Sequence, residues 1–128
     1  MTIKFDPIAG RTDEIIEAVM QSTEVQGVPE LDYTLRLVTE ELVANVVNYS
    51  TSDDITVDVE REGDLLRLRF SDHGVPFNPL EQENPDITLG VEEREIGGLG
   101  IFLVKELMDK VSYQYDQERN ILTLEKRV

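Results

Sequence analysis

The hydrophobic period of this chain changes from that of a helix to that of a strand near its middle. Over residues 29–49 apolar side chains recur at a period near 3.5, which predicts an amphipathic helix of about five turns beginning at Pro29. The period then drops to two in ITVDVE (55–60) and LLRLRF (65–70), which Gly63-Asp64 separates. A helix followed by an antiparallel hairpin predicts a sheet with helices on one face.

Weaker patterns before this helix and after this hairpin predict further strands and helices. TIKF (2–5) predicts a short edge strand stopped by Asp6-Pro7, and helical spacing after a Thr12 or Asp13 cap predicts a helix over about 12–25. After GGLG (97–100) the sequence predicts a helix over 101–108, a strand over 111–115, a turn over 117–120 and a strand over 121–126. The predicted fold class is α+β, a two-layer α/β sandwich with a mainly antiparallel sheet covered on one face by helices.

The length of 128 residues predicts a single domain, 1–128. Residues 73–96 hold three prolines and no sustained period. Such a loop is longer than compact domains normally carry without a function, and it is often a lid.

Charge and composition exclude several functions. With 12 Lys and Arg against 27 Asp and Glu, the net charge of −15 repels nucleic acid and anionic membranes, so neither is expected as a partner. The chain has no Cys and a single His, which excludes thiol chemistry, cysteine-ligated zinc and a histidine-rich metal site. No export signal or 18-residue apolar run is visible, so we expect a cytoplasmic protein.

Three local patterns could carry chemistry. Glu41 and Asn45 lie four residues apart, on one face of the predicted long helix. The carboxylate could act as a general base and the amide oxygen could bind Mg²⁺, although a solvated helix face has the same spacing.

The second pattern follows the hairpin, where Asp72 ends a strand and Gly74 opens a loop. An Asp at this position can accept a hydrogen bond from an exocyclic amine, and glycine lets a ligand approach the backbone. An Asx-type turn is the alternative interpretation. His73 is expected to be an exposed turn residue without a partner or a role.

The third pattern is GGLG (97–100) before a helix. Backbone N–H groups at a helix N-terminus attract phosphates, and Gly98 and Gly100 would let a phosphate approach. The pattern is neither a P-loop nor a dinucleotide fingerprint, and a flexible turn is the alternative.

Taken together and in this order, the three patterns resemble the GHKL superfamily of ATPases, with ELVAN (41–45) as the N-box and DHGVPF (72–77) and GGLG (97–100) as the glycine boxes. The resemblance covers nearly the whole chain and implies a Bergerat-type ATP-binding fold. Within the superfamily, the chain is most similar to bacterial anti-sigma-factor serine/threonine kinases.

The resemblance implies a role for each motif residue. Glu41 would be the general base and Asn45 the residue that holds Mg²⁺ against the phosphates of ATP. Asp72 would bind the adenine amino group, with Gly74 beside the base. Gly98 and Gly100 would belong to the phosphate-contacting end of an ATP lid over about 73–97.

The resemblance also implies an activity and partners. Such a kinase phosphorylates a serine of an anti-anti-sigma (STAS-type) protein, sequesters a sigma factor and is often a homodimer. A non-catalytic nucleotide-binding module that only sequesters a protein is the alternative, whereas a sensor histidine kinase would need a phosphoacceptor domain that 128 residues leave no room for.

Two features depart from the family pattern. Tyr49 stands one turn after Asn45, where many relatives have His. The predicted lid is acidic and would bring negative charge towards a polyphosphate, with a single cation, Arg94, against Glu81, Glu83, Asp86, Glu92, Glu93 and Glu95.

Overall fold

The structure is a computed structural model that describes residues 1–81 and 98–128. Residues 82–97, and with them most of the predicted lid, lie outside the described residues. The regular elements are β1 (Thr2–Phe5), α1 (Thr12–Met20), α2 (Thr23–Gln26), η1 (Pro29–Leu31), α3 (Asp32–Asn45), η2 (Val46–Ser50), β2 (Ile55–Glu62), β3 (Leu65–Asp72), η3 (Pro79–Glu81), α4 (Gly98–Leu107), β4 (Lys110–Asp116) and β5 (Arg119–Arg127).

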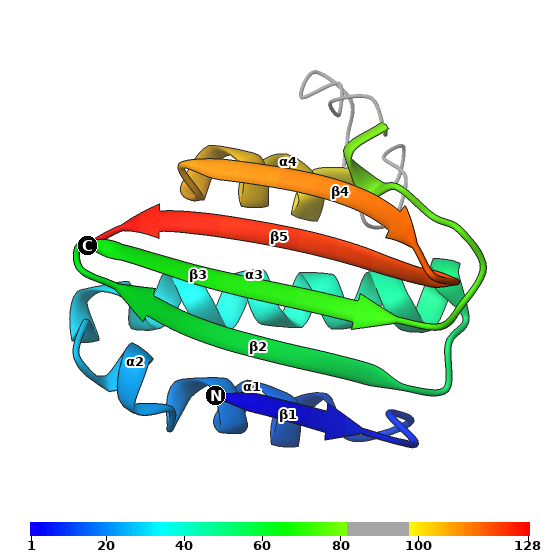
Figure 1. Cartoon of the computed structure of the whole chain (residues 1–128), viewed down its shortest axis with the longest axis horizontal. Coiled ribbons are helices and arrows are strands. Elements are labelled where there is room, and N and C mark those ends of the chain that lie inside the picture. The colour runs from blue at the N-terminus through cyan, green and yellow to red at the C-terminus, as the bar shows by residue number, and fades with distance from the viewer. Residues whose placement is uncertain (82–97) are drawn as a thin grey trace.

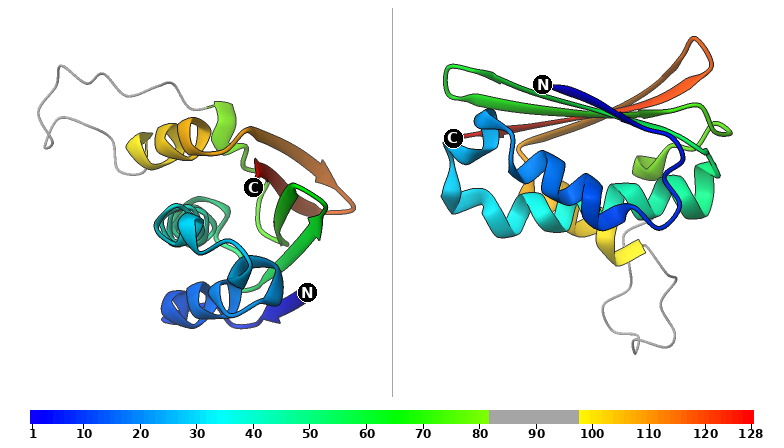
Figure 2. Two further views of the ribbon diagram at one scale, coloured as in Figure 1. Left: turned by 90° about the vertical axis from the view of Figure 1, so that its left-hand side faces the viewer. Right: turned by 90° about the horizontal axis from the view of Figure 1, so that it is seen from below.

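The five strands form one sheet in the order β1-β2-β3-β5-β4, and every neighbouring pair is antiparallel. The helices cover one face of this sheet, with α3 between α1 and α4 (Figures 1 and 2). The predicted two-layer α+β sandwich is therefore confirmed, and TIKF is the edge strand that the sequence predicts.

The core lies between these two layers. Strand residues that point towards the helices, such as Val57 and Leu68, are buried against apolar residues of α3 such as Val38. Burying each aliphatic side chain of this size contributes about 1.5–3 kcal/mol, so the helix layer is held on the sheet chiefly by the hydrophobic effect. The register of β3 and β5 places Asp72 directly opposite Asn120 at the end of the sheet.

The first predicted helix is interrupted. It ends at Met20, and α2 begins only at Thr23. The Ser22 hydroxyl donates a 2.7 Å hydrogen bond to the carbonyl of Val19, and this local bond competes with a continuous helix. The predicted Thr12 or Asp13 cap is also wrong, because Arg11 occupies the N-cap position and makes no side-chain capping hydrogen bond.

The long helix is a composite of three kinds of turn. A 3₁₀ turn precedes α3, and a π turn, η2, follows it over Val46–Ser50. The π turn closes with a 2.8 Å hydrogen bond from the N–H of Thr51 to the carbonyl of Val46. Thr51 has a φ of 54°, so the helix ends in a left-handed residue before the two aspartates predicted to break it.

The last hairpin turns earlier than the sequence predicts. Gln117 and Glu118 adopt positive φ angles of 52° and 62°, the geometry of a two-residue turn. Asn120, predicted to lie in the turn, is instead the second residue of β5. Its side chain therefore faces the interior.

No helix within the described ranges is long and apolar enough to cross a bilayer.

Candidate functional site

The candidate site begins at Asp72, the last residue of β3. Only 3% of Asp72 is exposed, and its Oδ1 accepts hydrogen bonds from the N–H of Gly74 (2.8 Å) and from Nδ2 of Asn120 (3.1 Å). Burial raises the pKa of this carboxyl above its ordinary value, although both hydrogen bonds oppose that shift. The Asx-type turn, which is the alternative interpretation of this motif, is therefore present, and it uses one carboxylate oxygen only.

A small cavity brings two of the predicted site residues together. Its volume is about 30 Å³, room for roughly one water, so a larger ligand requires wall side chains to move. Polar side chains from four elements, α3, η2, β3 and β5, line it beside apolar side chains: Asn45, Ser50, Asp72 and Asn120 with Leu42, Val46, Phe70, Phe77, Pro79, Tyr113 and Leu122.

Gly74 holds the loop after β3 against the end of the long helix. A Cβ at this position would overlap the backbone of Ser50, whose carbonyl accepts a 2.9 Å hydrogen bond from the N–H of Val75. Glycine is needed here for a close approach of two backbones. The structure thus gives Gly74 a packing role beside the cavity.

Glu41 lies one turn before Asn45 on α3, and its carboxylate contacts the first turn of α4. A Cβ on Gly100 would overlap this carboxylate. The Oε1 atom is buried and has no hydrogen-bond partner among the described residues. Burial, and secondarily the charge of Glu40, raises the pKa of Glu41 from its ordinary 4.5 to about 7.

Asn45 is a second polar side chain with unused hydrogen-bonding capacity. Only 4% of it is exposed, and Nδ2 has no partner among the described residues. A half-turn about χ2 exchanges the nitrogen with the oxygen, a hard donor of the kind Mg²⁺ prefers. The described residues contain no cluster of three acidic or histidine side chains for a metal. A Mg²⁺ ion that takes most ligands from water and phosphate fits this donor set.

Gly98 is the first residue of α4, so the predicted glycine box opens this helix. With Gly100 beside Glu41, the predicted residues fall on adjoining elements: the end of β3, one face of α3 and the first turn of α4.

Sequence reasoning misses Asn120, because it assigns this residue to a turn. One signal was available: strand alternation counted back from Leu122 and Leu124, both buried, puts residue 120 on the inward face. Asn120 is 5% exposed and contacts Asp72 directly.

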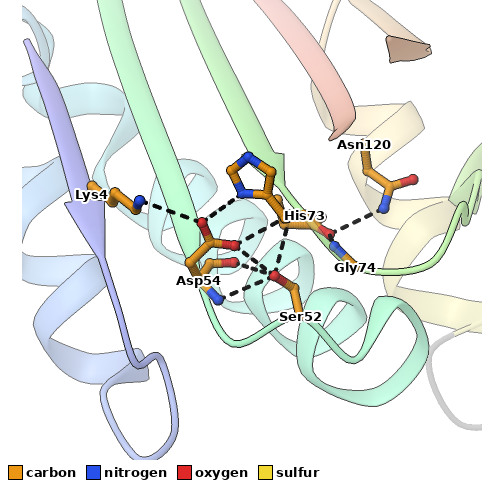
Figure 3. A network of polar contacts seen from close by, with 7 residues as sticks. Lys4, Ser52, Asp54, His73, Gly74 and Asn120 are labelled. Atoms are coloured by element: carbon orange, nitrogen blue, oxygen red, sulfur yellow. Dashed lines mark hydrogen bonds and ion pairs between the residues drawn. The ribbon is translucent and has the colours of Figure 1, made fainter. Parts of the chain in front are cut away.

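The expectation for His73 is only half correct. Its side chain is 52% exposed, but Nδ1 lies 2.7 Å from Oδ2 of Asp54, and its N–H donates to Oδ1 of Asp54 at 3.2 Å. Ser52 and Lys4 complete this network, which lies between β1 and the end of β3 (Figure 3). Burial alone would raise the pKa of Asp54, but hydrogen bonds from Ser52 and His73 outweigh it and lower the pKa.

Comparison with known proteins identifies a family to which the chain is similar. A family model described as the histidine kinase-like ATPase domain matches residues 8–126. The serine-protein kinase RsbW of Listeria innocua serovar 6a is 34% identical over 91 residues, 65% of this chain and 58% of that protein. RsbW of Bacillus cereus (strain ATCC 10987 / NRS 248) is 30% identical over 95 residues, 69% of this chain and 59% of that protein. The serine/threonine-protein kinase BtrW of Bordetella bronchiseptica is 26% identical over 98 residues, 73% of this chain and 69% of that protein.

The match to this chain thus covers less than two thirds of the length of either RsbW protein. The matches confirm the resemblance that the N-box and the two glycine boxes indicate.

Proposed function

We propose, from the premise that this chain belongs to the histidine kinase-like ATPase domain family, that it is an ATP-dependent protein serine/threonine kinase and an anti-sigma factor. In this proposal it phosphorylates an anti-anti-sigma protein of the STAS type and sequesters a sigma factor. The observation that supports catalysis most directly is the carboxylate of Glu41, which is partly buried, unpartnered at Oε1 and enclosed by Gly100.

The adenine end of the proposed site is Asp72. Oδ1 already accepts two hydrogen bonds, and Oδ2 accepts none from the described residues. The free oxygen would accept one N–H from the exocyclic amine of adenine. Because the cavity holds only about 30 Å³, binding would require its wall, which includes Phe77, to open.

At the phosphate end, Glu41 would take the proton from the attacking serine hydroxyl. A general base works best when its pKa lies near the working pH, and a pKa of about 7 meets that condition. Asn45 would hold Mg²⁺, which when bound neutralises charge on the phosphates. The N–H groups of the turn that contains Gly98 and Gly100 would contact the phosphates.

The partners follow from the resemblance and from charge. A net charge of −15 favours a basic protein surface over nucleic acid or an anionic membrane. Relatives named serine-protein kinases support a protein substrate. We further propose that residues 1–128 act as one domain in a homodimer, that 73–97 includes the ATP lid, and that the protein regulates transcription in the cytoplasm.

A non-catalytic module that binds nucleotide and sequesters a partner is the second candidate. The acidic surface would serve that function equally well. It has no need, however, of a carboxylate that costs free energy to bury and has no partner at one oxygen. The state of Glu41 therefore favours the kinase.

Two matched variants test the proposal. Asp72→Ala should weaken Mg-ATP binding, measured by calorimetry, about ten- to hundredfold, since a hydrogen bond to a charged group is worth about 1.5–3 kcal/mol. Glu41→Gln should keep Mg-ATP and sigma-factor binding, and lose about a hundred- to ten-thousandfold in transfer of labelled phosphate to the anti-anti-sigma protein.

Each result has a counterpart that contradicts part of the proposal. Unchanged affinity in Asp72→Ala would remove Asp72 from the adenine site. Wild-type transfer by Glu41→Gln would reject the general base. A wild-type protein that binds a sigma factor but transfers no phosphate would favour the sequestering module.

A further inference from the structure

The carboxamide of Asn120 uses all of its hydrogen-bonding capacity inside the protein. Nδ2 donates to Oδ1 of Asp72 at 3.1 Å and to the carbonyl of Val75 at 2.8 Å. Oδ1 of Asn120 accepts from the N–H of Phe77 at 2.9 Å and from the hydroxyl of Tyr113. Two donated and two accepted bonds fix the orientation of this side chain, because a flipped amide would set donor against donor.

The orientation of Asn120 determines what Asp72 can offer to a ligand. A carboxylate oxygen has two lone pairs, and on Oδ1 of Asp72 both are taken, by Asn120 and by the N–H of Gly74. Oδ2 accepts nothing among the described residues. The buried carboxylate therefore has one oxygen free to bind a ligand instead of two.

One free oxygen and two free oxygens select different purines. Adenine offers a carboxylate the N–H of its exocyclic amine, and one acceptor oxygen satisfies it. Guanine offers two parallel donors, N1–H and the 2-amino group, which pair best with both oxygens of a carboxylate at once. If only one oxygen is free, guanine must bury one donor without a partner, and that costs binding free energy.

We infer that Asn120 is a specificity-determining residue, which restricts Asp72 to a single acceptor and so selects adenine over guanine. Asn120 acts on the base through Asp72, as a positioning residue, and takes no part in phosphoryl transfer. The inference rests on the proposed function, because it requires a purine nucleotide at this site.

The test compares the affinities of Mg-ATP and Mg-GTP, each measured by calorimetry, in the full chain and in Asn120→Ala. The substitution frees one lone pair of Oδ1, so GTP should bind about tenfold tighter or more, while the affinity ratio of ATP to GTP falls by at least that factor. A purely structural role would weaken both nucleotides together, and so would leave the ratio unchanged.

Tyr113→Phe is the matched control. It removes one hydrogen bond to the carboxamide oxygen of Asn120, while the N–H of Phe77 still holds the carboxamide and Nδ2 stays on Asp72. Because Tyr113 also lines the cavity, the variant can shift both affinities, but they should shift by the same factor, so that the ATP to GTP ratio remains that of the wild type. Asn120→Ser, which cannot span to Asp72 and Val75 together, replaces Asn120→Ala if thermal unfolding shows that the alanine variant does not fold.

An unchanged GTP affinity in a folded Asn120 variant would overturn the inference and leave the proposed function intact. An equal gain of GTP binding in Tyr113→Phe would also overturn it, because the effect would then come from loosened packing. If the wild-type chain binds neither nucleotide, the proposed function itself fails, and the two failures are distinguishable.

Discussion

Gly100 packs against the carboxylate of Glu41 with no space for a side chain between them. The first turn of α4 is thereby brought over the proposed base on α3. The contact joins the GGLG motif to the N-box, two segments more than fifty residues apart in the sequence. Both the reactivity and the stability of the domain should respond to changes at this contact.

Gly100→Ala should separate activity from stability. The added methyl group would displace the flexible end of Glu41, so phosphate transfer should fall about a hundredfold, the usual scale of general-base assistance. Alanine in place of a helical glycine should at the same time keep or raise the melting temperature. Gly27→Ala is a matched control, since the one atom its methyl group would crowd is the flexible end of the Arg61 side chain, and it should transfer at the wild-type rate.

The pH dependence of phosphate transfer should report the ionisation of Glu41. The base must be ionised, so kcat/KM should rise with pH and level off above about 7. Glu40→Gln removes the smaller of the two causes of the raised pKa, so the ascending limb should move part of the way to lower pH. The exposed Glu30→Gln changes the net charge equally and should leave the limb in place. A profile that is flat from pH 5 to 8 would contradict the assignment.

Glu41 should also make the fold less stable as the pH rises. Its pKa is higher in the folded state, about 7, than the ordinary value of 4.5, so the folded state holds the proton more tightly. Stability is therefore lost as the pH increases through this window. Glu41→Gln cannot ionise, and thermal unfolding should show its melting temperature moving above that of the wild type between pH 5 and pH 8. A constant difference across that range would mean that the pKa is not raised.

Gly74→Ala should destabilise the domain. The new Cβ would meet backbone atoms of Ser50, which cannot move aside as the end of a side chain can. Overpacking of this kind typically costs about 1–3 kcal/mol, and urea unfolding measures it. Gly27→Ala again supplies the control, with a change well below 1 kcal/mol. A Gly74→Ala domain of wild-type stability would show that the loop can move away from the helix freely.

Asp54 and His73 should be energetically coupled. A double-mutant cycle with Asp54→Asn and His73→Ala should give a coupling free energy of about 1 kcal/mol at neutral pH, because the two side chains meet at 2.7 Å. The pKa of Asp54 is lower in the folded state, so its contribution to stability is present at neutral pH and lost as the pH falls below about 4. If the two substitutions had additive effects on stability at neutral pH, the contact between Asp54 and His73 would contribute nothing to stability.

The sequence predicts the elements that depend on local periodicity and misses what depends on distant partners. The hairpin over 55–70 and the face shared by Glu41 and Asn45 follow from spacing alone. The partner of His73 is Asp54, nineteen residues earlier and just before β2, and no local pattern encodes that pairing.

Asn120 is missed for a different reason. Asn favours turns, and this preference outweighs the alternation of the strand that follows. The break after Met20 similarly depends on one hydroxyl that bonds to the backbone of the preceding turn. Intrinsic propensity is a weak guide at such positions, because tertiary or local side-chain bonds decide the outcome.

The π turn at Val46–Ser50 makes the chain length of this stretch critical. Successive residues of a helix lie about 100° apart around the axis, and a π turn holds one residue more than an α turn. Deleting a single residue here would rotate the carbonyl of Ser50 away from the N–H of Val75, whatever side chains remained. We therefore expect substitutions within residues 46–50 to be tolerated as long as the number of residues is kept. A deletion scan should find this stretch far less tolerant than a substitution scan does.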